Sequence, residues 1–141
     1  MKTRILSFIF LVAINATLFA QHNCNVEVTS LKADKGYVFF GLYDKEKGFL
    51  DSKSQIATAK VKATGQKVDY TFKNLPDGDY AIAVYQDVNS NGKCDKNIIG
   101  YPTEGFGFSQ NYRPKLSAPN FDEVKMTINR SSKISIALIG N

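Results

Sequence analysis

Short runs of alternating apolar and polar residues, separated by turn residues, recur along this chain and restrict its fold more than any other feature. Alternation with a period of two is typical of a strand with one buried face. The runs lie at residues 25–31, 37–43, 56–63, 68–72, 80–85, 124–128 and 134–138. They predict an all-β fold, a seven-stranded antiparallel β-sandwich in which the last two strands pair across residues 129–133.

One long stretch departs from this pattern. Residues 87–121 have little strand character, although they make up 35 positions. An irregular segment of that length inside a compact domain is usually functional, or is held by something other than strand pairing. We therefore expect the functional residues of the chain in this loop.

The N-terminus has the layout of a secretory signal peptide over residues 1–20. Lys2 and Arg4 precede an apolar stretch, and Ala20 is a small residue suited to the cleavage position. A membrane anchor is the alternative, but a bilayer span needs about 20 apolar residues, and Asn15 interrupts this stretch. We expect one mature domain, residues 21–141, that is secreted or periplasmic and has no membrane span.

Charge gives little indication of a partner. Without residues 1–20 the chain carries 16 basic and 13 acidic side chains, a net charge of +3. The lysines are scattered, whereas a nucleic-acid footprint requires a concentrated basic stripe. We expect no nucleic-acid partner and a monomeric protein.

The two cysteines lie 70 residues apart, at Cys24 and Cys94. Cysteines of exported proteins can pair in an oxidising compartment, and closing so long a loop would stabilise the fold by roughly 4 kcal/mol. A disulfide is one interpretation. The other is that Cys94 is a small buried apolar residue.

The segment Asp87–Asp95 is the clearest chemical signal. Oxygen-bearing side chains occupy positions 1, 3, 5 and 9 of the segment, and Gly92 occupies position 6. This spacing matches the first nine positions of an EF-hand loop, in which alternate Asp and Asn side chains converge on Ca²⁺. The predicted ligands are Asp87, Asn89, Asn91, the Lys93 carbonyl and Asp95.

The match is incomplete at position 12, where Ile98 replaces the bidentate Glu of an EF-hand. A missing ligand would come from Glu104, Asp79 or water. With few certain carboxylates, we expect weak affinity, roughly 10⁻⁴–10⁻³ M. The alternative is a turn in which the Asx side chains bond their own backbone and no metal is held.

Four aromatic residues follow in a glycine-rich stretch, at Tyr101, Phe106, Phe108 and Tyr112. An exposed cluster of rings could bind a glycan or a peptide. Alternatively, the rings pack this loop against the rest of the domain.

Three segments in order resemble a known family: 74–81 (NLPDGDYA), 87–92 (DVNSNG) and 100–109 (GYPTEGFGFS). Together they are similar to the exported bacterial proteins called domain of unknown function 2141, over residues 24–138. The Leu-Pro-x-Gly-x-Tyr pattern at 75–80 also resembles a turn of prealbumin-like and collagen-adhesin B-type modules. The resemblance implies an immunoglobulin- or prealbumin-like sandwich, and it supplies no catalytic residues.

Three functions are compatible with these residues. The first is an exported, non-enzymatic module with a Ca²⁺-ordered loop, and the second is a glycan- or peptide-binding module that uses the aromatic residues. The third is a hydrolase that uses carboxylates such as Asp87 and Glu104. Catalysis based on histidine is not expected, because the single His, His22, lies at the start of the mature chain.

Overall fold

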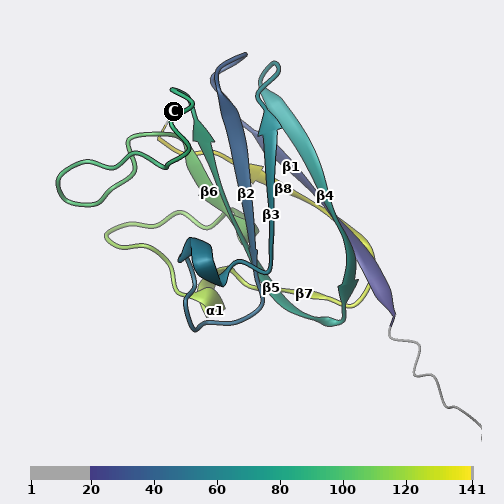
Figure 1. Cartoon of the computed structure of the whole chain (residues 1–141). Helices are drawn as coiled ribbons and strands as arrows, with labels where there is room; N and C mark the ends of the chain where they lie inside the picture. Colours follow the sequence, from purple (N-terminus) through teal and green to yellow (C-terminus); the bar gives the residue numbers. More distant parts are fainter. Residues whose placement is uncertain (1–19, 141) are drawn as a thin grey trace, which may run out of the picture.

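A computed structural model describes residues 20–140, and these residues form two β-sheets (Figure 1). The predicted signal peptide therefore lies outside the described residues, apart from Ala20. The strands are β1 (Gln21–Thr29), β2 (Tyr37–Tyr43), β3 (Ala57–Lys62), β4 (Lys67–Pro76), β5 (Gly78–Asp87), β6 (Phe106–Phe108), β7 (Met126–Ile128) and β8 (Ser132–Ala137). Short helical segments are η1 (Ser52–Ser54), η2 (Ser109–Asn111) and α1 (Phe121–Val124).

The first sheet has the strand order β4-β1-β8, and the second has the order β3-β2-β5-β6, with β7 also paired to β5. β1 and β4 run antiparallel, whereas β1 and β8 run parallel. The prediction of seven antiparallel strands is therefore wrong in two respects, because the described residues form eight strands and the first sheet is mixed. The mostly-β fold with two sheets is confirmed.

The expected pair at the C-terminal end of the chain does not form. β7 pairs with the start of β5, and β8 pairs with β1 instead. β8 thereby becomes the third strand of the first sheet, and β7 extends the pairing along β5. Val124, predicted as the start of a strand, ends α1, whose N-terminus carries a capping box between Asn120 and Glu123.

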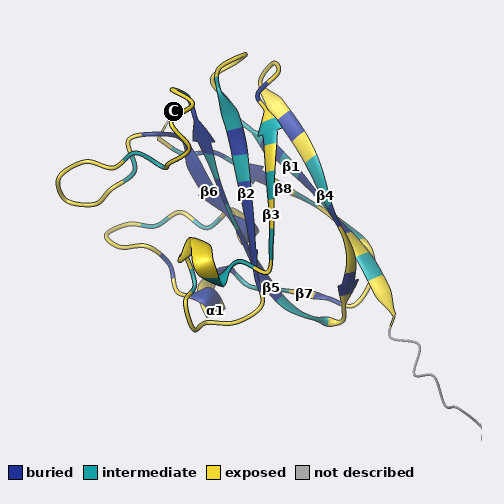
Figure 2. Ribbon diagram, viewed as in Figure 1, coloured by how far each residue is buried: buried dark blue, intermediate teal, exposed yellow. Residues whose placement is uncertain are grey.

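One apolar core fills the space between the sheets, and both sheets contribute to it (Figure 2). The alternation predicted for residues 25–31 holds within β1, since Val26 and Val28 point inward and are fully buried. Cys24, which precedes the predicted run, extends the same buried face. The inward residues of the second sheet include Phe40, Leu42, Ile82 and Val84, and Ile136 enters from β8.

A second, smaller core lies on the opposite face of the second sheet. Tyr43, Phe106 and Phe108 pack there with Phe121 of α1. Between the two Phe residues, Gly107 points toward the main core, where a Cβ would lie 2.6 Å from Ile136 Cγ2. Glycine is needed at this position because β6 packs so closely against β8.

β6 and β7 pair with the same edge of β5, and Ser109 fills the gap between them. Its Oγ accepts a hydrogen bond from Ile82 N at 3.0 Å and donates one to Val124 O at 2.5 Å. The fully buried hydroxyl therefore satisfies an N–H that neither short strand reaches. This bond holds the segment after β6 against the second sheet.

Candidate functional site

Asp87 ends β5, is fully buried, and begins the predicted metal loop. Gly36 packs directly on its backbone, since a Cβ on Gly36 would lie 1.8 Å from Asp87 O. Gly36 also has a φ of +62°, a conformation that glycine adopts without strain. The turn before β2 thus fixes the starting point of the loop.

The buried carboxylates of Asp87 and Glu104 hold the loop in place by accepting hydrogen bonds from its backbone. Asp87 accepts hydrogen bonds from Asn91 N at 3.0 Å and Gly92 N at 2.7 Å. Glu104, which is 6% exposed, accepts hydrogen bonds from Val88 N at 2.9 Å and Asp95 N at 3.1 Å. All four carboxylate oxygens therefore accept hydrogen bonds from backbone N–H groups. This role is structural, and it gives no support to the hydrolase alternative.

Asn89, Asn91 and Asp95 converge above this base. The Asn89 amide donates to Asp95 Oδ2 at 2.7 Å, and the Asn91 amide donates to Asp95 Oδ1 at 2.9 Å. The amide oxygens accept hydrogen bonds from the backbone, Asn89 Oδ1 from Asn91 N at 3.1 Å and Asn91 Oδ1 from Lys93 N at 2.9 Å. The last two bonds are the Asx turns of the metal-free interpretation.

The structure thus brings Asp87, Asn89, Asn91 and Asp95 into one loop, with Glu104 below it. Asp79 lies at the other end of β5, where it accepts a hydrogen bond from Thr127 and pairs with Lys125. Within residues 20–140, no three Asp, Glu, His or Cys side chains gather around one position suited to a metal. A cation in this loop would depend on amide and carbonyl oxygens, and Ca²⁺ binding stays a prediction.

The two cysteines lie on opposite sides of the second sheet, and both are free. Cys24 is buried in the main core, whereas Cys94 lies over the outer face of the sheet. The predicted disulfide is therefore absent. Burial, with the negative charge of Glu104 as a second cause, raises the pKa of Cys94 to about 11. Its thiol stays protonated at neutral pH.

His22 does not lie in a free terminus, because β1 begins at Gln21. Its Nε2 lies 2.6 Å from Asp77 Oδ1, and Asp77 occupies the turn between β4 and β5. Asp87 and the predicted loop lie at the far end of β5, so the histidine takes no part in that site.

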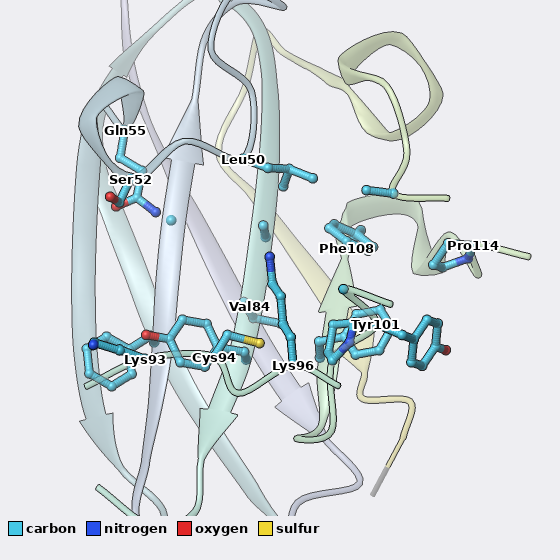
Figure 3. Close-up of a pocket in the computed structure, with 18 of the residues that line it drawn as sticks. Leu50, Ser52, Gln55, Val84, Lys93, Cys94, Lys96, Tyr101, Phe108 and Pro114 are labelled. Atoms are coloured by element: carbon cyan, nitrogen blue, oxygen red, sulfur yellow. The ribbon is translucent and has the colours of Figure 1, made fainter. Parts of the chain in front are cut away.

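A cleft of about 890 Å³ lies on the outer face of the second sheet (Figure 3). Its floor is made of side chains that β2, β5 and β6 direct away from the main core. Three segments form its walls: residues 50–55, residues 92–102 and residues 114–118. Lys96 and Cys94 lie over the middle of the sheet, and Tyr101 lies to one side, near Pro114. The loop that begins at Asp87 therefore supplies one wall.

Aromatic rings dominate this cleft. Phe39 and Tyr85 stack with centroids 5.0 Å apart and ring planes within 2°. Tyr101 contacts Phe106 edge-on at 5.6 Å. Of the four predicted aromatic residues, Tyr101, Phe106 and Phe108 line the cleft. Tyr112 does not line it, and its hydroxyl donates to Glu123 at 2.8 Å.

The packing interpretation of the aromatic stretch holds for two of its four rings, and ligand binding stays a prediction. Phe106 and Phe108 are buried and pack the loop onto the sheet, as the structural alternative predicted. Tyr101 is 43% exposed at the edge of the cleft and is available to a ligand.

Comparison with known protein families gave a match, which covers residues 26–136. A family model described as an uncharacterized protein conserved in bacteria (DUF2141) matches this range. The chain belongs to this family. The resemblance inferred from its three motifs is confirmed. A search of curated proteins and a search of solved structures each gave no match.

The DUF2141 match extends from within β1 to within β8, so the loop and the cleft both lie inside the family domain. The description of DUF2141 assigns no function, and it therefore brings no ligand and no catalytic residue to this chain. None of the helices in residues 20–140 has the length and apolar character needed to cross a bilayer.

Several cleft residues of this DUF2141 chain were missed as site residues at the sequence level. Phe39, Tyr43 and Tyr85 were assigned to strands only, and Lys96 was passed over. A signal was present, because β2 reads Tyr-Val-Phe-Phe-Gly-Leu-Tyr and is apolar at nearly every position. Strands that are apolar on both faces are usually covered on both. The run therefore indicates a second covered face.

Proposed function

We propose that this protein is an exported, non-catalytic binding module. Its cleft over β2, β5 and β6 takes a glycan or a peptide, and the Asp87–Asp95 loop binds Ca²⁺. The ion would hold in place the wall that carries Cys94 and Lys96.

The cleft is the observation that carries this proposal. Its volume of about 890 Å³ falls within the range of about 300–1,000 Å³ typical of ligand sites. Ligand sites are mostly apolar with a few polar groups that orient the ligand. Here aromatic residues are accompanied by the Ser52 hydroxyl, the Gln55 amide and the Lys96 ammonium. Flat rings suit the apolar faces of sugars and of peptide side chains.

The chemistry of the loop supports Ca²⁺ over softer metals, because every candidate donor is an oxygen. Asn89 and Asn91 already direct their amide groups toward the Asp95 carboxylate, within 2.7–3.1 Å. Rotation of each amide would direct its oxygen toward that carboxylate. The rotation would also break the hydrogen bonds that the amide oxygens accept from Asn91 N and Lys93 N. Metal–oxygen contacts to a cation would then replace these two bonds and the three N–H···O contacts to Asp95.

Ligand binding is tested by screening the purified protein on a glycan array and a peptide array. Any ligand found is then titrated into Tyr101→Ala and Tyr112→Ala. We expect the first variant to bind at least about tenfold more weakly, which corresponds to 1.4 kcal/mol. The second is the matched control, because Tyr112 lies outside the cleft. Equal losses in both variants, or no ligand on either array, would contradict the cleft proposal.

Calcium binding is tested by calorimetric titration and thermal shift, with Asp95→Ala as the variant and Asp34→Ala as the control. The Asp95 carboxylate accepts hydrogen bonds from the Asn89 and Asn91 side-chain amides, whereas the Asp34 carboxylate accepts one from Gly65 N in a distant turn. We expect a wild-type Kd of roughly 10⁻⁴–10⁻³ M, lost in Asp95→Ala and kept in the control. No heat and no thermal shift in the wild type would refute the Ca²⁺ site and leave the cleft proposal intact.

A further inference from the structure

Two loops expose aliphatic side chains at their tips. Ile98 and Leu116 are fully exposed, and Ile99 is 83% exposed. Single exposed apolar residues are common on protein surfaces, but several on adjoining segments are typical of an interaction surface. We call residues 96–103 and 112–120 the tip loops.

The tip loops lie on the same side of the molecule. Both border the cleft, since Ile99 and Tyr101 of one loop and Pro114 and Leu116 of the other line it. In Figure 1 they project in the same direction, away from both sheets. Figure 2 shows them mostly in the colour of exposed residues. Ile98 lies outside the cleft, so a ligand bound there would not cover it.

The charge on the tip loops is entirely positive. They carry Lys96, Arg113 and Lys115, and neither loop contains Asp or Glu. Among the described residues, none of these three cations forms an ion pair, whereas Lys67, Lys125 and Lys133 are paired elsewhere. Unpaired cations beside exposed aliphatic tips are complementary to a surface with negative head groups above hydrocarbon.

We propose that the tip loops dock this protein on an anionic phospholipid surface. Ile98, Ile99 and Leu116 enter the boundary between head groups and acyl chains, and Arg113 and Lys115 contact lipid phosphates. Lys96, whose side chain lies over the sheet, adds positive charge to this side of the molecule. Basic side chains near such a surface are attracted to its negative charge, and apolar insertion strengthens the binding.

The experiment is co-sedimentation with vesicles in EDTA, which prevents Ca²⁺ bridging. Mass spectrometry first establishes whether residues 1–20 are present, because that apolar segment would itself bind lipid, and all variants are compared in the same form. We expect binding to phosphatidylglycerol-containing vesicles, weaker binding to pure phosphatidylcholine, and weakening by salt.

Two variants and one control separate the contributions. Ile98→Ser/Ile99→Ser/Leu116→Ser and Lys96→Glu/Arg113→Glu/Lys115→Glu should each reduce binding by about tenfold or more. Ile56→Ser is the control, because Ile56 is 46% exposed and lies outside the tip loops. Circular dichroism checks the fold of each variant.

Three outcomes would overturn the proposal: no vesicle binding by the wild type, binding unchanged in both triple variants, or an equal loss in Ile56→Ser. Analytical ultracentrifugation without lipid adds a fourth. If the wild type self-associates, the serine variant does not, and vesicles are not bound, the tip loops join two copies of this chain instead. None of these outcomes depends on a ligand in the cleft.

Discussion

The outer faces of the two sheets differ in chemistry. On the first sheet, the outward residues of β1, β4 and β8 are polar and meet across the strands. Asn25 donates to Thr71 at 2.9 Å, and Glu27 pairs with Lys67 at 3.2 Å and Lys133 at 3.6 Å. This face needs no cover, as is usual for an antiparallel pair with one solvated side.

The outer face of the second sheet is aromatic and partly covered. Phe39 and Tyr85 stack on it, Phe106 and Phe108 are buried there, and three loop segments surround the cleft. Large apolar faces are rarely left open to water without a function. The proposed ligand binding therefore belongs to the second sheet, whereas the outer face of the first sheet carries polar pairs that need no cover.

The largest expected difference between the faces comes from truncating a buried ring. Phe108→Ala should destabilise the protein by about 3–5 kcal/mol, because it leaves a cavity in the second core. Ser135→Ala, on the exposed face of β8, should change stability by less than about 0.5 kcal/mol. Urea unfolding measures both. A loss below about 1 kcal/mol for Phe108→Ala would mean that this face is not a core.

The next largest loss of stability is expected at the contact between β6 and the main core. Gly107→Ala places a methyl group 2.6 Å from Ile136 Cγ2, so we expect a loss of about 1–3 kcal/mol from overpacking. A double-mutant cycle with Ile136→Ala tests the cause, because removing the clashing methyl should make the double variant more stable than the sum of the single losses predicts. Strict additivity would place the strain elsewhere.

The wall of the cleft depends on Asp87. Asp87→Ala removes the acceptor of Asn91 N and Gly92 N, and we expect a loss of about 1.5–3 kcal/mol, typical of hydrogen bonds to a charged group. Hydrogen exchange should show faster exchange of these amides, while the amides of β1 change only as far as global stability does. Unchanged exchange at Gly92 would contradict this role of the carboxylate.

Alkaline pH should act mainly on the second sheet. Burial raises the pKa of Cys94 from 9.0 to about 11 and the pKa of Tyr85 from 10.0 to about 12. Because the folded state favours the neutral forms, their contribution is complete below about pH 9 and is lost as the pH rises toward 12. Thermal unfolding should show this decline, and Cys94→Ala should reduce it. An equally steep decline in that variant would exclude Cys94 as its cause.

Acid should weaken the ion pairs on the outer face of the first sheet, and this is the smallest of the expected effects. The hydrogen bond from Lys67, with the charge of Lys133, holds the pKa of Glu27 below 4.5. Its contribution is present above that pH and is lost as the pH falls. Glu27→Gln should slightly reduce the loss of unfolding free energy that occurs as the pH falls. Added salt should have the same effect, because the ion pair between Glu27 and Lys67 lies at the surface and is screened by salt. A large effect that salt does not change would contradict this.

Sequence reasoning worked best for the first two strands of the described chain. The alternation in β1 located its inward residues, and the range of β2 was predicted as observed. It failed at the C-terminal strands, because β7 and β8 are short segments whose partners lie elsewhere in the chain. Local pattern does not determine which of several open edges a strand joins.

The same division applies to the candidate site. The sequence spacing is enough to bring four side chains into one loop: Asp87, Asn89, Asn91 and Asp95. In a tight turn, alternate side chains point toward the same region and can bond to each other and to the backbone. The sequence by itself therefore determined most of the strands, the family and the oxygen-rich loop, but not β6. Only the tertiary structure placed that loop beside Phe39 and Tyr85 to form a cleft. The physical reason is that a cleft depends on which sheet face each distant segment covers, and packing of the whole chain decides this.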